Sequence, residues 1–207
     1  MKDLSLASLK EFTATAQLGA RTGTNQVKTS FGISAREFLG FAAYDFHAEY
    51  NHHTVNALSN TKRAIECQID SLLVAFGLLE RAKKGKWGFP AKTDTLRRLG
   101  IAAPEILERI NQKRNFLEHE YRAPEPNEVQ DALDVAKLFI EYTDKFLCHP
   151  WVTCEIQSDV ADDFVLAELD HEQRRIVIRW SGVEKVIDAA SEEYIDYLAW
   201  LIPFLGQ

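Results

Sequence analysis

The chain has 207 residues, 46% of them hydrophobic, and a net charge of −7, so it can bury a core as one domain or as one domain with a substantial appendage. No stretch approaches the roughly 18 continuous apolar residues of a membrane span, and the N-terminus lacks the apolar core of a secretory leader. The three cysteines show no C-x-x-C spacing, so we expect a soluble, cytoplasmic protein without a disulfide framework.

The first fifty residues predict two helices separated by a loop. Apolar residues from Leu4 to Phe12 favour a short helix, and the polar, Gly/Thr-rich run from Gly19 to Ser30 predicts a loop. Ser34 and Glu37 form an S-x-x-E capping box, which predicts a helix over residues 35–50. We expect the next residues, 51–53, to break or bend that helix.

The longest predicted helix covers residues 55–79, where apolar side chains recur at spacings of three, four and seven. A basic loop with Gly and Pro ends it over residues 83–90, and a short helix follows and closes at Gly100. Pro104 and Pro124 bound a further helix over residues 104–122. A last long helix is predicted from a capping box of Asn127 and Gln130 up to Pro150.

Beyond residue 149 the apolar period changes from helical to extended. Four short β-rich runs are predicted, and a last helix starts near Ser191; the runs are 151–156, 164–169, 176–180 and 183–187. The turn between the second and third runs is placed at Asp170 to Gln173. We therefore predict a mainly α protein, with a helical domain over residues 1–149 (bundle core about 35–148) and a small antiparallel β-meander with a C-terminal helix over residues 150–207.

The charge is divided unevenly between these two predicted domains. Residues 1–149 carry 20 basic and 19 acidic side chains, whereas residues 150–207 carry 4 basic and 12 acidic ones. Within residues 81–122 the balance is reversed, with 11 basic against 5 acidic. Such a local basic excess can meet phosphates, although an ordinary solvated surface gives the same count.

The octapeptide of residues 114–121 places a cation, an amide and an imidazole on the predicted helix 104–122. At about 100° per residue, Arg114 falls on the edge of the apolar stripe that includes Tyr121, and Asn115 and His119 fall on the polar face. Arg114 and His119 are then about 140° apart, so one straight helix does not complete a site. Two copies of the helix about a twofold axis would bring each Arg toward the other chain's His.

These residue types suit the cleavage of a phosphodiester. The imidazole of His119, with an ordinary pKa of about 6.5, can take or give a proton at neutral pH. The Arg114 guanidinium would offset the charge that builds on the phosphate, and Asn115 could orient His119 or donate to the same phosphate. The alternative on spacing alone is that Arg114 pairs with Glu118 while His119 lines a helix contact.

Arg114-Asn115-x3-His119-x-Tyr121, followed by one more long helix, resembles the R-x4-6-H motif of HEPN domains, the higher eukaryote and prokaryote nucleotide-binding family. The resemblance implies an up-down helical bundle that dimerises, with Arg114 and His119 catalytic and Asn115 supporting, and in many members metal-independent RNA cleavage. In toxin members paired with a minimal nucleotidyltransferase antitoxin, the Tyr of H-x-Tyr is nucleotidylated, which here is Tyr121. A minimal toxin lacks the β-rich tail after residue 149.

Other groups of residues are weaker candidates for a functional site. Asp45, Glu49 and His53 would share a face, and so suit a metal, only if their helix continued. We assign no metal, because Asn51 is expected to interrupt that helix. No phosphate-binding, dinucleotide-binding or serine-hydrolase motif is present, and we assign no cofactor. In the basic loop, Trp87 could stack a base while lysines hold phosphates, or plug the loop onto the core; the lysines are Lys83, Lys84 and Lys86.

The sequence therefore predicts a homodimeric, metal-independent endoribonuclease of the HEPN type, in a toxin or phage-defence role. Its expected partners are an RNA substrate and an antitoxin such as a minimal nucleotidyltransferase. The alternative is a non-catalytic nucleotide-, RNA- or protein-binding regulatory module that uses the acidic tail for recognition.

Overall fold

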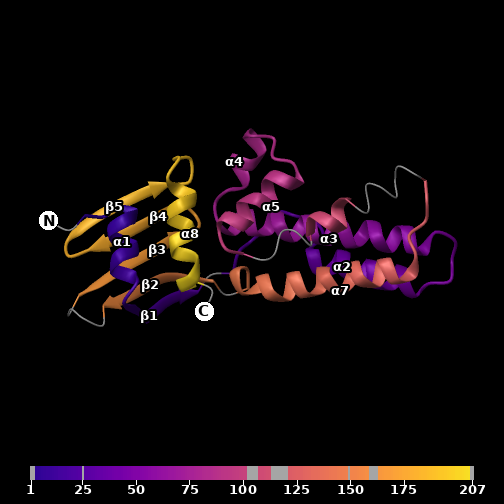
Figure 1. Ribbon diagram of the computed structural model, residues 1–207, viewed down its shortest axis with the longest axis horizontal. Coiled ribbons are helices and arrows are strands. Elements are labelled where there is room, and N and C mark those ends of the chain that lie inside the picture. Colours follow the sequence, from indigo (N-terminus) through magenta and orange to yellow (C-terminus); the bar gives the residue numbers. More distant parts are fainter. Residues whose placement is uncertain are drawn as a thin grey trace.

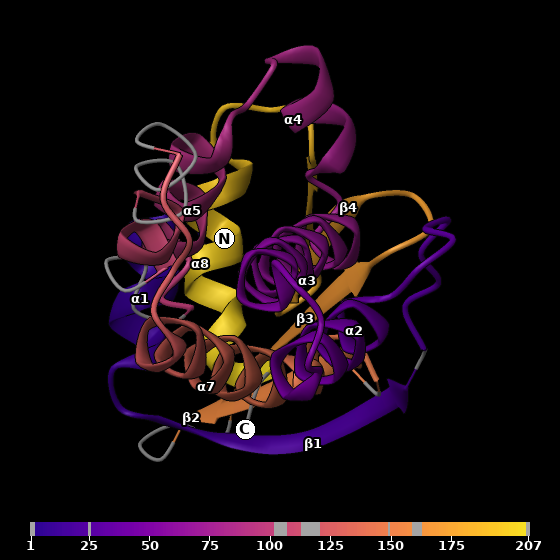
Figure 2. The same cartoon turned by 90° about the vertical axis from the view of Figure 1, so that its right-hand side faces the viewer.

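The computed structural model describes residues 3–24, 26–101, 107–112, 121–148, 150–158 and 163–205. Figure 1 shows an elongated molecule with a β-sheet at one end and a group of long helices at the other. The described strands form a five-stranded antiparallel sheet in the order β1-β2-β3-β4-β5. Two helices, α1 (Leu6–Thr13) and α8 (Tyr194–Leu205), lie on the same face of this sheet (Figures 1 and 2).

The predicted β-rich runs are confirmed as strands of a meander. They are β2 (Trp151–Ser158), β3 (Phe164–Asp170), β4 (Arg175–Trp180) and β5 (Val183–Asp188), each antiparallel to the next. The predicted turn after β3 is also present, because the Gln173 backbone N–H donates to Asp170 Oδ1 at 2.9 Å. A side chain that holds its own turn in this way is typical of Asp.

The predicted loop from Gly19 to Ser30 is wrong over its first part. Residues Ala16–Thr24 form β1, which pairs with β2 so that Ala16 lies opposite Ser158 and Thr24 opposite Trp151. The register shifts between Leu18 and Arg21. β1 pairs on one edge only, contains two glycines and has an irregular register. Its apolar residues therefore do not alternate cleanly, which is why its sequence looks like a loop.

The mainly α fold class is therefore wrong, and the protein is α+β. The β-rich part is not a small appendage of the last 58 residues, because α1 and β1 from the start of the chain join it. The pairing of β1 with β2 links residues more than a hundred positions apart, and apolar periodicity carries no information about such a contact. How the chain divides into domains at residue 149 stays a prediction.

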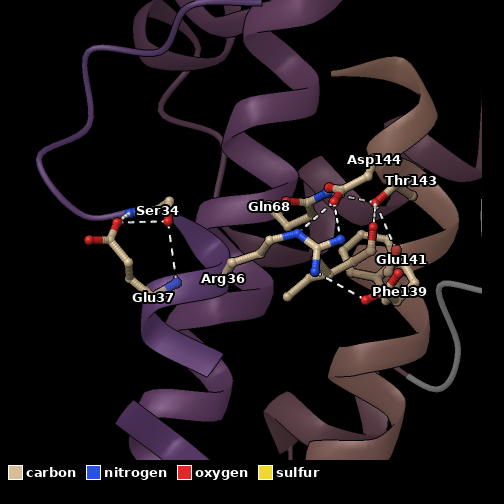
Figure 3. A network of polar contacts seen from close by, with 9 residues as sticks. Ser34, Arg36, Glu37, Gln68, Phe139, Glu141, Thr143 and Asp144 are labelled. Carbon is tan, nitrogen blue, oxygen red and sulfur yellow. Dashed lines mark hydrogen bonds and ion pairs between the residues drawn. The ribbon is translucent and has the colours of Figure 1, made fainter. Parts of the chain in front are cut away.

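The helical part is built on α2 (Ala35–His47), α3 (His53–Ala75) and α7 (Pro126–Thr143), and 3-10 helix η1 (Asp144–Phe146) follows α7. The Ser34–Glu37 capping box is confirmed, but α2 ends at His47, three residues before the predicted end, and α3 begins at His53. Figure 3 shows a polar network that joins the three helices. Arg36 of α2 donates to Glu141 at 3.0 Å and to Asp144, and Gln68 of α3 donates to Thr143 at 2.8 Å and to Asp144 at 3.0 Å.

Two glycines with positive φ follow the ends of helices, and only the second of these stops was predicted. Gly77 (φ +69°) follows α3, and the Leu78 N–H donates back to the Leu73 carbonyl at 2.7 Å. Gly100 (φ +71°) likewise closes α5 (Phe89–Arg98), as predicted. Because α3 stops before residue 77, the predicted helix 55–79 is two elements, and α4 (Leu79–Lys84) is the second. The capping box of α7 is also shifted from the prediction: Glu125 and Glu128 form it, with Pro126 in the first turn.

The sheet and the helices share one continuous hydrophobic core, which includes Leu72 of α3 and Leu198 of α8. Two long-range hydrogen bonds, one buried and one partly buried, join the C-terminal end of α3 to the sheet side. Tyr194 Oη donates to the Phe76 carbonyl at 2.9 Å, and His171 Nδ1 lies 2.7 Å from the Ala75 carbonyl. Among the described residues, no helix has the length and apolar character that crossing a membrane requires.

Candidate functional site

Most of the octapeptide falls outside the described residues. Arg114, Asn115 and His119, the predicted catalytic and supporting residues, lie in the stretch 113–120, so their predicted roles remain predictions. Tyr121 is described, and its side chain is 95% exposed. Its backbone has φ +54°, which a helix does not allow, so the predicted helix does not continue through residue 121. The placement of Tyr121 on the buried apolar stripe is therefore wrong.

The two flanks of the octapeptide meet at one place on α3. Arg109 and Ile110, before the octapeptide, and Glu128, after it, line a small cavity of about 160 Å³ together with Leu58. Leu58 belongs to the N-terminal third of α3. Both flanks are thus held at the end of α3 that lies far from the sheet, because the opposite end carries the contacts to His171 and Tyr194.

The predicted RNA-binding residues lie on α4 and the loop after it, where the structure separates them. Lys83 forms an ion pair with Glu80 at 3.0 Å, one turn earlier in α4. Lys86 is exposed, with φ +51°, in the turn that ends the helix. Trp87 is half-buried and packs against the core, as expected if it attaches the loop to the core and does not stack a base. Lys84 and Trp87 come together as part of the lining of a larger cavity.

That larger cavity has a volume of about 540 Å³ and lies between α4 and the sheet side. Its other wall is formed by Gln173 and Arg174 of the β3–β4 turn and by Asp188, the last residue of β5. Sequence reasoning missed these three residues. The only signal is the pair Arg174-Arg175 beside a predicted turn, and nothing in the sequence indicates that this turn lies against α4.

The basic side chains around this cavity change the pKa of Glu80. The hydrogen bond from Lys83 lowers the pKa of Glu80, and the nearby charges of Lys83, Arg174 and Lys84 lower it further. Arg81, which also lines the cavity, donates from Nη1 to the Ser191 carbonyl at 3.0 Å. The cavity wall therefore carries several cations and two carboxylates, those of Asp188 and of Glu80, and Glu80 is already engaged by Lys83.

Asp45, Glu49 and His53 do not share one helix face, as the metal-binding alternative required. The helix that was to carry all three ends at His47, and α3 begins separately at His53. Asp45 instead accepts hydrogen bonds from Tyr50 Oη at 2.5 Å and Asn60 Nδ2 at 2.8 Å, and its bond raises the pKa of Tyr50. In the part of the chain that the structure describes, no group of three or more His, Cys, Asp or Glu side chains is arranged to hold a metal.

Comparison of the chain with protein-family models, with curated proteins and with solved structures finds no match.

Proposed function

We propose that the chain is a metal-independent endoribonuclease of the HEPN type, with Arg114 and His119 as catalytic residues and Asn115 in support. The observation that carries the proposal is the octapeptide itself, which combines a guanidinium, an amide and an imidazole at the spacing of that family. The exposure of Tyr121 supports it, because the end of the octapeptide is open to a large substrate. The proposal places the protein in the cytoplasm.

The chemistry is transesterification within the RNA. A base removes the proton of the 2′-hydroxyl, whose oxygen attacks the adjacent phosphorus. The bond from phosphorus to the 5′-oxygen breaks as that oxygen takes up a proton from an acid. His119 is suited to move these protons near neutral pH, and Arg114 to stabilise the negative charge of the pentacoordinate phosphorus. The products carry a 2′,3′-cyclic phosphate and a 5′-hydroxyl, and no step uses a metal ion.

We further propose that the active site is composite, with Arg114 from one subunit and His119 from the other. The five-residue spacing separates the two side chains by about 140° on a helix, which disfavours a site within one chain. In a twofold dimer each composite site would pair one Arg114 with the partner's copy of His119.

The first test is cleavage of a mixed RNA pool by the purified protein in EDTA. Arg114→Ala and His119→Ala are each expected to abolish cleavage, whereas Arg63→Ala and His47→Ala, on α3 and α2, serve as matched controls and retain it. If the folded, dimeric wild-type protein binds RNA without cutting it, the enzyme proposal fails and the non-catalytic binding module takes its place.

A subunit-mixing experiment tests the composite site. When Arg114→Ala and His119→Ala chains are mixed equally and allowed to exchange, about half of the dimers contain one chain of each kind. One of the two sites in each such dimer then has both wild-type residues, so about one quarter of the wild-type activity should return. A site formed within one chain would regain nothing.

Regulation by an antitoxin is proposed at Tyr121. Its nearly full exposure leaves the phenol accessible to a nucleotidyltransferase of the minimal type. Transfer of a nucleotide to the Tyr121 oxygen would add a bulky anion beside the catalytic residues, which would repel the phosphates of RNA.

A further inference from the structure

The cavity between α4 and the β3–β4 turn has the size of a small-molecule site. Its volume of about 540 Å³ lies within the range of roughly 300–1,000 Å³ that is common for ligand pockets. Its walls come from parts of the chain that are about ninety residues apart, with Lys84 on one side and Arg174 on the other. The two walls are close because Gly77 has no side chain: a Cβ there would lie 3.1 Å from Arg174 Cβ.

The two cations on opposite walls are available to a ligand. Lys84 and Arg174 are both exposed, and among the described residues neither side chain forms a hydrogen bond or an ion pair. Glu80, a carboxylate that also lines the cavity, forms an ion pair with Lys83 at 3.0 Å. An ammonium and a guanidinium that face one cavity from two sides suit a phosphate group, which offers several acceptor oxygens.

The remaining lining groups are unlike those of a site for a bare anion. Trp87 contributes an aromatic wall, and its indole lies close against Gly85, since a Cβ on Gly85 would lie 2.6 Å from Trp87 Nε1. Asp188 contributes a carboxylate, of which Oδ1 accepts from the Ala190 N–H at 2.8 Å. A carboxylate repels phosphate but accepts hydrogen bonds from sugar hydroxyls or base amino groups, and an aromatic ring can contact a base.

We propose that this cavity binds a nucleotide, with Lys84 and Arg174 on its phosphate, Asp188 as acceptor for its sugar or base, and Trp87 as an aromatic wall. The nucleotide is either free or one unit of a single-stranded RNA, since both present the same phosphate, sugar and base. Neither Arg114 nor His119 enters this inference, so it stands or falls separately from the proposed ribonuclease.

Calorimetric titration of the full chain tests the proposal. The probes are inorganic phosphate, the common nucleoside 5′-monophosphates and a short single-stranded RNA, and the RNA is titrated against His119→Ala protein so that it stays intact. Binding of a monophosphate assigns the cavity to a free nucleotide, and binding of the RNA alone assigns it to a unit of RNA. If nothing binds, or if inorganic phosphate binds as tightly as either nucleotide ligand, the proposal is overturned.

Charge variants then locate the binding. Lys84→Gln and Arg174→Gln should each weaken binding about tenfold, because each removes a charge-assisted contact to phosphate. Lys137→Gln, an exposed lysine of α7 with the same change of charge, should leave the affinity within about twofold, since a distant surface charge is screened by salt. Equal affinities for Lys84→Gln, Arg174→Gln and Lys137→Gln would overturn the assignment.

One variant changes the shape of the cavity without changing its charge. In Gly85→Ala the new methyl group meets the Trp87 indole, so the indole must move. Binding of the nucleotide should weaken while the circular dichroism spectrum stays that of the wild type. Unchanged affinity in this variant would remove Trp87 from the proposed site.

Discussion

Tyr194→Phe tests the junction between the sheet side and α3. The variant removes one oxygen atom from a side chain that is fully buried in the shared core. In the wild type that oxygen donates a hydrogen bond of 2.9 Å to the carbonyl of Phe76, which is itself buried, just after the end of α3. The bond joins residues 118 positions apart, so it exists only if α8 lies against this end of the helix.

The expected cost follows from what the variant leaves behind. Phenylalanine fills nearly the same space, so packing changes little, but the Phe76 carbonyl loses a donor in a place that water does not reach. An unsatisfied buried acceptor costs about 1–3 kcal/mol, and we expect the free energy of unfolding to fall by about 2 kcal/mol. For a chain of this length that corresponds to a Tm lower by roughly 4–8 °C.

Urea unfolding followed by circular dichroism measures the change. Tyr142→Phe is the matched control, because Tyr142 is 51% exposed and its loss of a hydroxyl should change the free energy of unfolding by less than about 0.5 kcal/mol. If the two variants are equally stable, the Tyr194 hydrogen bond is not formed in solution. The arrangement of α8 against the end of α3 would then be wrong.

Two further predictions concern the same junction. Burial lowers the pKa of His171, whose Nδ1–H donates to a carbonyl of α3 while Nε2 is buried without a partner. As the pH drops below about 6.5, the unfolded chain takes up a proton on His171 before the folded chain does, so the free energy of unfolding should decrease down to the lowered pKa. Measured from pH 7.5 to 5.5, the free energy of unfolding of His171→Asn should lack this decrease. An identical pH profile in the variant and the wild type would refute the prediction. Gly77→Ala should destabilise by about 1–2 kcal/mol, because φ is +69° there and the methyl group meets Arg174. Gly40→Ala, within α2 and with open space around it, should instead raise the Tm, and a loss in both variants would contradict the backbone explanation.

Local signals in the sequence were sufficient for most elements but not for the fold class. The capping box at Ser34, the stop at Gly100 and the four strands after residue 150 all depend on residues within a few positions of one another. Such patterns act through neighbouring backbone groups and are visible in the sequence. The strand β1 depends instead on pairing with β2, more than a hundred residues away, so the same run of Gly and Thr was read as a loop.

The same distinction applies to the candidate sites. Lys84 and Trp87 could be selected from the sequence because a basic loop with an aromatic residue suggests contact with nucleic acid. Arg174 and Asp188 could not, because only the fold places the β3–β4 turn and the end of β5 beside α4. The predicted surroundings of Tyr121 were wrong. A helical period extended through this residue placed it on the buried apolar stripe, whereas its positive φ ends that period and its ring is exposed.

The described flanks of the octapeptide and the nucleotide cavity lie at opposite ends of α3, and this separation limits how the two proposed sites could cooperate. The flanks of the octapeptide meet near Leu58, whereas Gly77, which borders the nucleotide cavity, follows Phe76. At about 1.5 Å per residue, the eighteen residues from Leu58 to Phe76 span about 27 Å. A single nucleotide cannot reach both places in one subunit, but an RNA chain of several nucleotides can. In the proposed ribonuclease, Lys84→Gln should therefore weaken RNA binding and raise KM, while kcat stays unchanged.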